Sequence, residues 1–182
     1  MSETLRISGV VRESIVDGKG LRFVVFCQGC PHHCLGCHNP QTHDFAGGYD
    51  IDIDKIVSEI QKNPLLQGVT FSGGEPFSQS EAFAALGRKI KAIRGMKLNL
   101  MSYSGYTFEQ LSEMKKEDAG IGKLLDICDF LVDGPFLIQE RDLSLKYRGS
   151  RNQRYIDLKK TLKSGTVVLA SEKEKPARER YQ

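Results

Sequence analysis

The sequence predicts an α/β fold, in the form of an open, partial TIM-like barrel of βα units. Short runs rich in β-branched and aromatic residues alternate with amphipathic helical segments, and such alternation favours parallel strands joined by right-handed crossovers. A closed eight-unit barrel needs about 250 residues, whereas this chain has 182. Because no internal repeat or long linker divides the chain, we expect a single domain over residues 1–182. We leave open whether residues 171–182 fold.

The first half of the chain predicts three strands and two helices. Strand-like runs occupy residues 5–11, 21–27 and 68–74. A helix is expected over residues 52–63, because the apolar residues Ile53, Ile56 and Ile60 follow helical spacing and Asp52 is a candidate N-cap. A second helix is expected over residues 80–93.

The second half continues the alternation, with strands expected at residues 96–103 and 130–136 and helices at 107–116 and 122–129. Thr107 and Gln110 match the capping-box pattern at the start of the third helix. Three notable stretches each follow a predicted strand, namely the cysteine-rich loop, "SGGEP" at 72–76 and "SYSGY" at 102–106. Chemistry in α/β folds collects at the C-terminal ends of strands. We therefore expect these stretches to form one site.

Composition places the chain among cytoplasmic proteins. Hydrophobic residues are 40% and charged residues 27% of the chain, which is typical of a globular domain. No apolar run is long enough to span a bilayer, and the first residues carry no secretory signal. From Arg141 onward the chain has 12 Lys/Arg against 5 Asp/Glu. Since no nucleic-acid motif accompanies this basic end, we expect a solvated tail and no direct nucleic-acid binding.

The segment "CQGCPHHCLGCHN", residues 27–39, holds four of the five cysteines. A disulfide framework is disfavoured in the reducing cytoplasm and by the odd number of cysteines. Zinc sites usually take two CxxC pairs about 15–20 residues apart, whereas three residues separate the pairs here. Closely spaced thiolates suit an iron–sulfur cluster, and a zinc-stabilised binding module without catalysis remains the alternative. Either Cys27 or Cys37 is then the cysteine left out. Cys27 ends a strand, so we expect it in the core.

At "CPHHCLGC" the sequence resembles the radical S-adenosylmethionine (SAM) superfamily, whose signature is CxxxCxxC. The resemblance implies a [4Fe-4S] cluster held by Cys30, Cys34 and Cys37. Three thiolates leave the fourth iron without a protein ligand, and SAM chelates that iron through its amino and carboxylate groups. The implied fold is the open barrel of the radical SAM type.

The same resemblance implies where SAM lies. "SGGEP" stands where the superfamily carries the strand-end segment that receives the SAM amino group. The residues expected to contact SAM are Gly36, Cys37, His38, Gly73, Gly74 and Glu75. No catalytic residue is expected beyond the cluster and SAM.

Longer stretches, among them "SYSGYTFEQL" and "LVDGPFLIQERDLSLKYRGSRNQRYID", are similar to the activating proteins of anaerobic ribonucleoside-triphosphate reductases. The similarity covers residues 15–157. It implies a radical SAM oxidoreductase that receives an electron from a flavodoxin or a similar low-potential donor. SAM is then cleaved to methionine and a 5′-deoxyadenosyl radical, which takes a hydrogen atom from a glycine of the reductase. The family also suggests a homodimer.

Several alternatives stay open at this point. The chain could activate another glycyl radical enzyme, or act on a small molecule like 7-carboxy-7-deazaguanine synthase. His32 and His33 either shape the cysteine loop or contact a redox partner, and Cys128 is expected to pack in the core. His43 stands where this family is expected to have Trp. The arginines at positions 148, 151 and 154 either bind the reductase or pack on the barrel.

Overall fold

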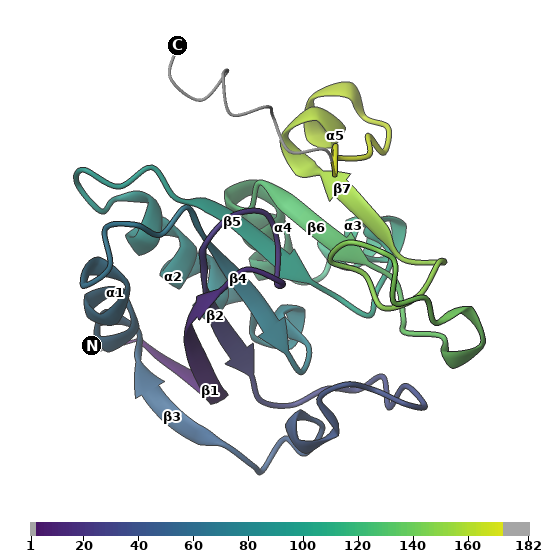
Figure 1. The fold of residues 1–182 in the computed structure, drawn as a ribbon, viewed down its shortest axis with the longest axis horizontal. Helices are drawn as coiled ribbons and strands as arrows, with labels where there is room; N and C mark the ends of the chain where they lie inside the picture. The colour runs from purple at the N-terminus through teal and green to yellow at the C-terminus, as the bar shows by residue number, and fades with distance from the viewer. Residues whose placement is uncertain (1–2, 173–182) are drawn as a thin grey trace.

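The computed structural model describes residues 3–172, so all but the first two residues of the segment 171–182 lie outside the described range. The described part is a mixed α/β structure with one seven-stranded sheet (Figure 1). The strands are β1 (Thr4–Ser14), β2 (Arg22–Cys27), β3 (Tyr49–Asp52), β4 (Gly68–Gly73), β5 (Asn99–Tyr103), β6 (Phe130–Asp133) and β7 (Arg154–Asp157). The α-helices are α1 (Ile53–Gln61), α2 (Ser80–Lys91), α3 (Phe108–Met114), α4 (Ala119–Ile127) and α5 (Leu158–Ser164).

The α/β class is confirmed, but parallel pairing is limited to the middle of the sheet. The strand order is β3-β1-β2-β4-β5-β6-β7, and the sheet is open. Only β2, β4, β5 and β6 run parallel, whereas β1, β3 and β7 pair antiparallel. The expectation of parallel strands throughout is therefore wrong at both edges. Residues 15–21 are too few for the crossover that a parallel β1–β2 pair would need.

Three of the four predicted helix starts are confirmed. The helix expected over residues 122–129 is α4, which begins earlier, at Ala119, because Asp118 caps it by accepting from the backbone N–H of Gly120. Asp52 caps α1 by accepting from the backbone N–H of Asp54 at 2.8 Å. Thr107 and Gln110 form the expected capping box of α3. Strands β3 and β7 and helix α5 were not predicted, because "YDID", "RYID" and "LKKTLKS" show weak apolar periodicity.

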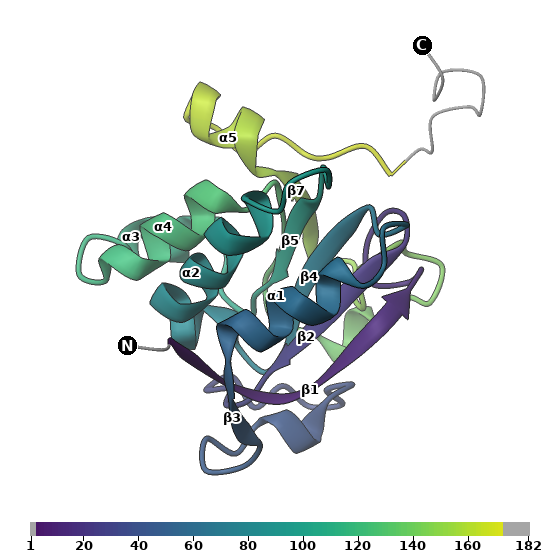
Figure 2. The ribbon, with the colours of Figure 1, turned by 90° about the vertical axis from the view of Figure 1, so that its left-hand side faces the viewer.

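The two faces of the sheet differ. The crossovers between the parallel strands are right-handed and all step in one direction across the sheet, from β2 towards β6, so their helices lie on the same face of the sheet. Helices α1, α2 and α4 cover that face (Figures 1 and 2). Phe23, Val25 and Cys27 of β2 pack there in the main core. Alternate residues point to the opposite face, where Met101 and Tyr155 belong to a smaller apolar cluster.

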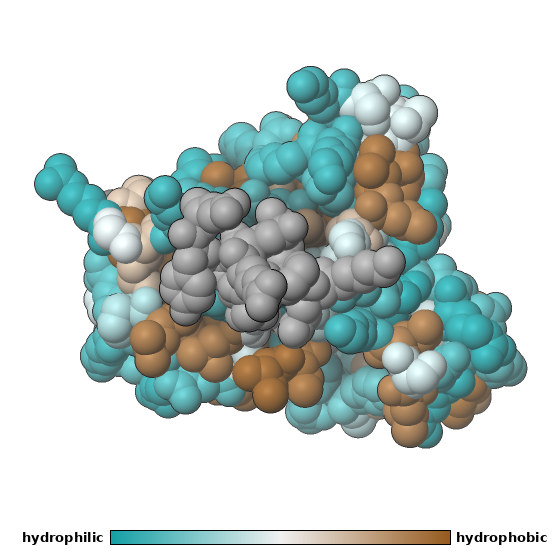
Figure 3. Space-filling view, turned by 45° about the horizontal axis from the view of Figure 1, so that its top comes forward, coloured by the Kyte–Doolittle hydropathy of each residue, from teal (hydrophilic) through white to brown (hydrophobic). Residues whose placement is uncertain are grey.

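Exposed apolar residues are spread over the surface. In the view of Figure 3, apolar surface lies in separate brown patches between polar ones. Among the most exposed large apolar side chains are Ile15, Val16, Leu35 and Leu143, each at least 71% exposed. No helix in residues 3–172 is long and apolar enough to cross a membrane.

Candidate iron–sulfur site

The three stretches selected from the sequence meet at the C-terminal edge of the parallel strands. The cysteine loop follows β2, the glycine-rich turn follows β4, and "SYSGY" ends and follows β5. Backbone hydrogen bonds join the first two, from Gly74 N to Cys27 O and from Glu75 N to Gly29 O, both at 2.8 Å. The predicted convergence on one site therefore agrees with the structure.

A cavity of about 490 Å³ opens beside these loops. This volume lies within the usual range for pockets that bind small molecules, roughly 300–1,000 Å³. Its lining includes Val16, Asp17, Phe26, Cys37, His38, Asn39, Ser72, Gly73, Tyr103, Phe136, Tyr147, Arg148 and Gln153. The wall thus combines the cysteine loop, three strand ends and the segment before β7.

The three cysteines of the signature are free and lie on this loop. Cys30 is buried, whereas Cys34 and Cys37 are half-buried. The Sγ of Cys37 accepts a hydrogen bond from the backbone N–H of Asn39 at 3.4 Å. Within residues 3–172, no three His, Cys, Asp or Glu side chains lie close enough to hold a single metal ion. A four-iron cluster is larger than an ion and binds thiolates at separate corners, so this donor set fits it in kind.

Cys27 differs from the other loop cysteines because it ends β2 on the helix-covered face. Its Sγ accepts from Gln79 Nε2 at 3.1 Å and contacts the carbonyl oxygen of Glu75 at 3.4 Å. Burial raises the pKa of the Cys27 thiol to about 12, so it stays a neutral thiol. Cys128 is likewise fully buried, as expected for a packing residue.

The residues expected to contact SAM fall into two groups. Cys37, His38 and Gly73 line the cavity, whereas Gly36, Gly74 and Glu75 are not part of its lining. Gly73 and Gly74 are both required to be glycine, because backbone atoms at the end of β2 and just after it lie too close for a side chain. A Cβ at Gly73 would lie 2.7 Å from Cys27 N, and one at Gly74 would lie 2.3 Å from Gly29 O.

Several wall residues were not named individually from the sequence. Ser72 and Tyr103 lie in two of the stretches expected at the site, whereas Phe26 lies in none of them. All three come from adjacent strands and share the helix-free face, so period-two counting from the core residues would have found them. Tyr147 gave no such signal. It has a φ of +63°, which is rare for a bulky residue, and its carbonyl accepts from the Tyr103 hydroxyl at 2.6 Å.

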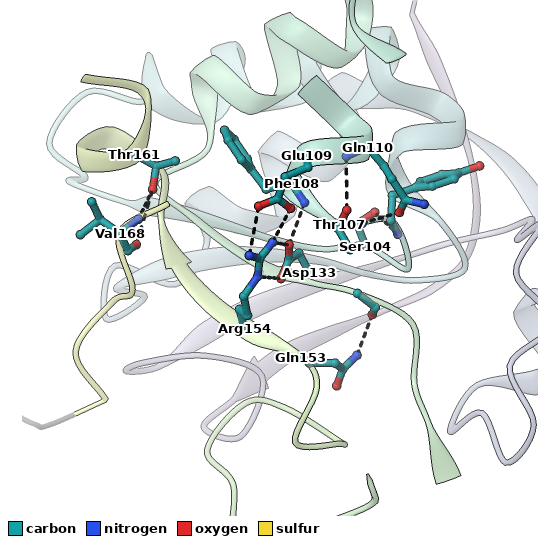
Figure 4. A network of polar contacts seen from close by, with 12 residues as sticks. Ser104, Thr107, Phe108, Glu109, Gln110, Asp133, Gln153, Arg154, Thr161 and Val168 are labelled. Carbon is teal, nitrogen blue, oxygen red and sulfur yellow. Dashed lines mark hydrogen bonds and ion pairs between the residues drawn. The ribbon is translucent and has the colours of Figure 1, made fainter. Parts of the chain in front are cut away.

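The three arginines of the C-terminal stretch have different environments. Arg154 binds buried Asp133 through Nε at 3.0 Å and Nη2 at 2.5 Å, and it also pairs with Glu109 on α3 (Figure 4). Hydrogen bonds to Asp133 and then Glu109 raise the pKa of Arg154. Arg154 therefore packs as a clamp between β6, β7 and α3. Arg148 lines the cavity and forms an ion pair with Glu172. Its buried Nε has no hydrogen-bond partner among the described residues. Arg151, in contrast, is exposed.

Comparisons with known proteins agree with this geometry. The family described as "4Fe-4S single cluster domain" matches residues 16–156. The anaerobic ribonucleoside-triphosphate reductase-activating protein of Vibrio cholerae is 32% identical over 145 residues, covering 76% of this chain and 89% of that protein. Its namesake from Enterobacteria phage T4 is 31% identical over 146 residues, covering 76% of this chain and 85% of its own length.

The chain belongs to the family of anaerobic ribonucleoside-triphosphate reductase-activating proteins. The resemblance stated from the sequence motifs is thereby confirmed. The match to the 4Fe-4S domain contains the whole cysteine loop and every segment that lines the cavity. The activating-protein family therefore supports an iron–sulfur cluster at this edge of the sheet.

Proposed function

We propose that this chain activates an anaerobic ribonucleoside-triphosphate reductase by generating its glycyl radical, as a radical SAM oxidoreductase. We further propose that residues 1–182 form one domain, with the open barrel of the radical SAM type. The observation that carries the proposal is the free thiol set of Cys30, Cys34 and Cys37 beside a cavity of ligand size. Membership of the activating-protein family supports the choice of reaction.

In this proposal Cys30, Cys34 and Cys37 hold a [4Fe-4S] cluster, and one iron stays free of protein ligands. When bound, the cluster supplies the electron that cleaves SAM to methionine and a 5′-deoxyadenosyl radical, which takes a hydrogen atom from a reductase glycine. Cys27 takes no part, because its side chain packs in the main core and its sulfur is bonded by Gln79. The chain's own work is to orient SAM and exclude water.

The cavity wall supports binding of SAM next to the cysteine loop. His38 borders the cavity and stacks at a tilt on Phe136, with ring centroids 5.2 Å apart. This pair offers an aromatic surface for adenine, while the backbone at Gly36 takes the adjoining edge. At the other end, Gly73 lines the cavity and lets the backbone approach the methionine part of SAM, with Gly74 next to it in the turn.

The partners follow from the same reaction. The substrate is a glycine-bearing loop of the reductase, and the electron donor is flavodoxin or a similar protein. Ile15, Val16, Leu35 and Leu143 expose apolar surface on segments at or next to the cavity wall, which suits contact with a protein. We also propose that the chain forms a homodimer and acts in the cytoplasm.

The test is electron paramagnetic resonance on the reductase after anaerobic incubation with the reconstituted chain, SAM and reduced flavodoxin. We expect a glycyl radical signal, and none with the Cys34→Ala variant. SAM cleavage without this signal would favour the activase of another glycyl radical enzyme or a small-molecule radical SAM enzyme. A colourless protein with one tightly bound zinc would favour the binding module.

A further inference from the structure

Glu75 is a completely buried carboxylate whose oxygens are bonded within the chain itself. Its exposed fraction is 0%. Oε1 accepts from the backbone N–H of Phe77 at 3.0 Å. Oε2 accepts from Ser104 Oγ at 3.0 Å and Gly105 N at 2.8 Å, and lies 2.7 Å from His32 Nε2. Both carboxylate oxygens are therefore bonded to groups of the chain itself. Glu75 is also not part of the cavity wall.

The donors come from three different loops. Phe77 belongs to the turn after β4, Ser104 and Gly105 follow β5, and His32 lies in the cysteine loop after β2. The ring of His32 is also fixed from its other side, since it meets the ring of Tyr106 edge-on with centroids 4.4 Å apart. Gly105 allows this approach, because a Cβ there would lie 2.3 Å from His32 Cδ2.

His32 stands between two of the proposed iron ligands. It follows Cys30 by two residues and precedes Cys34 by two. The bond from its ring to Glu75 therefore ties the backbone between these two cysteines to a buried carboxylate.

We propose that Glu75 and His32 are a positioning pair that fixes the cysteine loop between Cys30 and Cys34. Groups that orient a metal ligand commonly change metal affinity when they are removed. This role replaces the expected contact between Glu75 and the SAM ammonium. It rests on the cluster of the proposed function.

The test compares four variants of the full chain, reconstituted anaerobically with iron and sulfide. His32→Phe keeps the ring packed on Tyr106 but removes the donor, whereas His32→Gln keeps a side-chain N–H that can reach Glu75. His33→Phe is the matched control, because His33 is exposed and its ring contacts His43. Glu75→Gln replaces one carboxylate oxygen with an amide NH2 group, which faces donors and cannot accept their hydrogen bonds. For each variant, the iron content per chain, the rate of iron loss to a chelator and the affinity for SAM are measured.

We expect His32→Phe and Glu75→Gln to lose iron about tenfold faster than the wild type. His32→Gln should stay near the wild type, and His33→Phe should match it. Circular dichroism verifies that each variant folds. If Glu75→Gln does not fold, the two His32 variants decide.

Two results would overturn the proposal. One is a His32→Phe protein whose rate of iron loss equals that of His33→Phe. The other is a Glu75→Gln protein that keeps its cluster unchanged and loses only SAM affinity, which would return Glu75 to the SAM site. Failure of the proposed function shows separately, as a wild-type chain that takes up no four-iron cluster.

Discussion

Two charged side chains are buried at opposite ends of the parallel strands, and they serve different parts of the molecule. Arg22 begins β2 and is 1% exposed, while Glu75 follows β4 and is 0% exposed. The guanidinium of Arg22 donates to Thr70 Oγ1 and Asn99 Oδ1, both at 2.7 Å. It also donates to the carbonyls of Val69 at 2.9 Å and Lys19 at 3.0 Å.

The difference lies in what each group connects. Arg22 bonds mainly to β4 and β5 at the end where strands begin, and in α/β barrels that end serves stability. Glu75 bonds to loops at the end where strands finish and where function collects. Both groups are well bonded, so burial of a charge does not by itself mark a functional site. The partners decide whether a substitution unfolds the sheet or loosens the site.

Replacement of Arg22 should have the largest effect on stability. Arg22→Met leaves Asn99 Oδ1 and the Val69 carbonyl without this donor, and it should lower the free energy of unfolding by about 4 kcal/mol. Urea denaturation of the metal-free chain measures this. Arg12→Met is the matched control. Arg12 is 67% exposed and pairs with Glu59, so the change should cost less than about 0.5 kcal/mol. Equal stability of the two variants would mean that the buried Arg22 stabilises the sheet no more than the exposed Arg12.

Replacement of Arg154 tests a buried ion pair near the strand ends. Arg154→Met leaves Asp133, which is 1% exposed, with the backbone N–H of Phe108 as its remaining hydrogen-bond donor within residues 3–172, at 2.7 Å. We expect a loss of about 3 kcal/mol in the same assay. Arg151→Met, at an exposed position three residues earlier, should be close to neutral. A neutral Arg154→Met would mean that the clamp does not stabilise the sheet.

The smallest effect concerns pH. The hydrogen bond from Arg154 lowers the pKa of Glu109 below its ordinary value of 4.5. This group therefore adds stability that is fully present above pH 4.5 and is lost as the pH falls through the lowered pKa. Because Glu109 is largely exposed, the contribution is about 0.5 kcal/mol.

The Glu109→Gln variant isolates this contribution. Between pH 6 and 3, its urea midpoint should fall slightly less than that of the wild type. Parallel curves for the two proteins would exclude the contribution of Glu109.

The sequence was informative where a local rule decides the structure. Helix caps such as Asp52 depend on neighbouring residues alone, and the placing of three motifs at strand ends follows from strand–helix alternation. The edge strands β3 and β7 could not be predicted in this way. Their pairing depends on the length of the preceding connections and on a partner distant in the chain.

The candidate site shows the same division. Spacing left two cysteine triplets open, and the resemblance to the radical SAM signature selected Cys30, Cys34 and Cys37. The partners of Glu75 lie 30 or more residues away in two cases, at Gly105 and His32. Sequence spacing carries no information on which donors reach a buried carboxylate. The sequence therefore indicated SAM as the partner of Glu75, whereas in the structure its oxygens are bonded to groups of the chain.

The most direct test of the central claim is anaerobic iron and sulfide analysis with an absorbance spectrum, on the wild type, Cys27→Ser and Cys34→Ser. We predict a brown protein with about four irons for the wild type and for Cys27→Ser, and loss of the cluster in Cys34→Ser. A Cys27→Ser protein without its cluster would contradict the account, because four thiolates would then close the site and leave no iron for SAM.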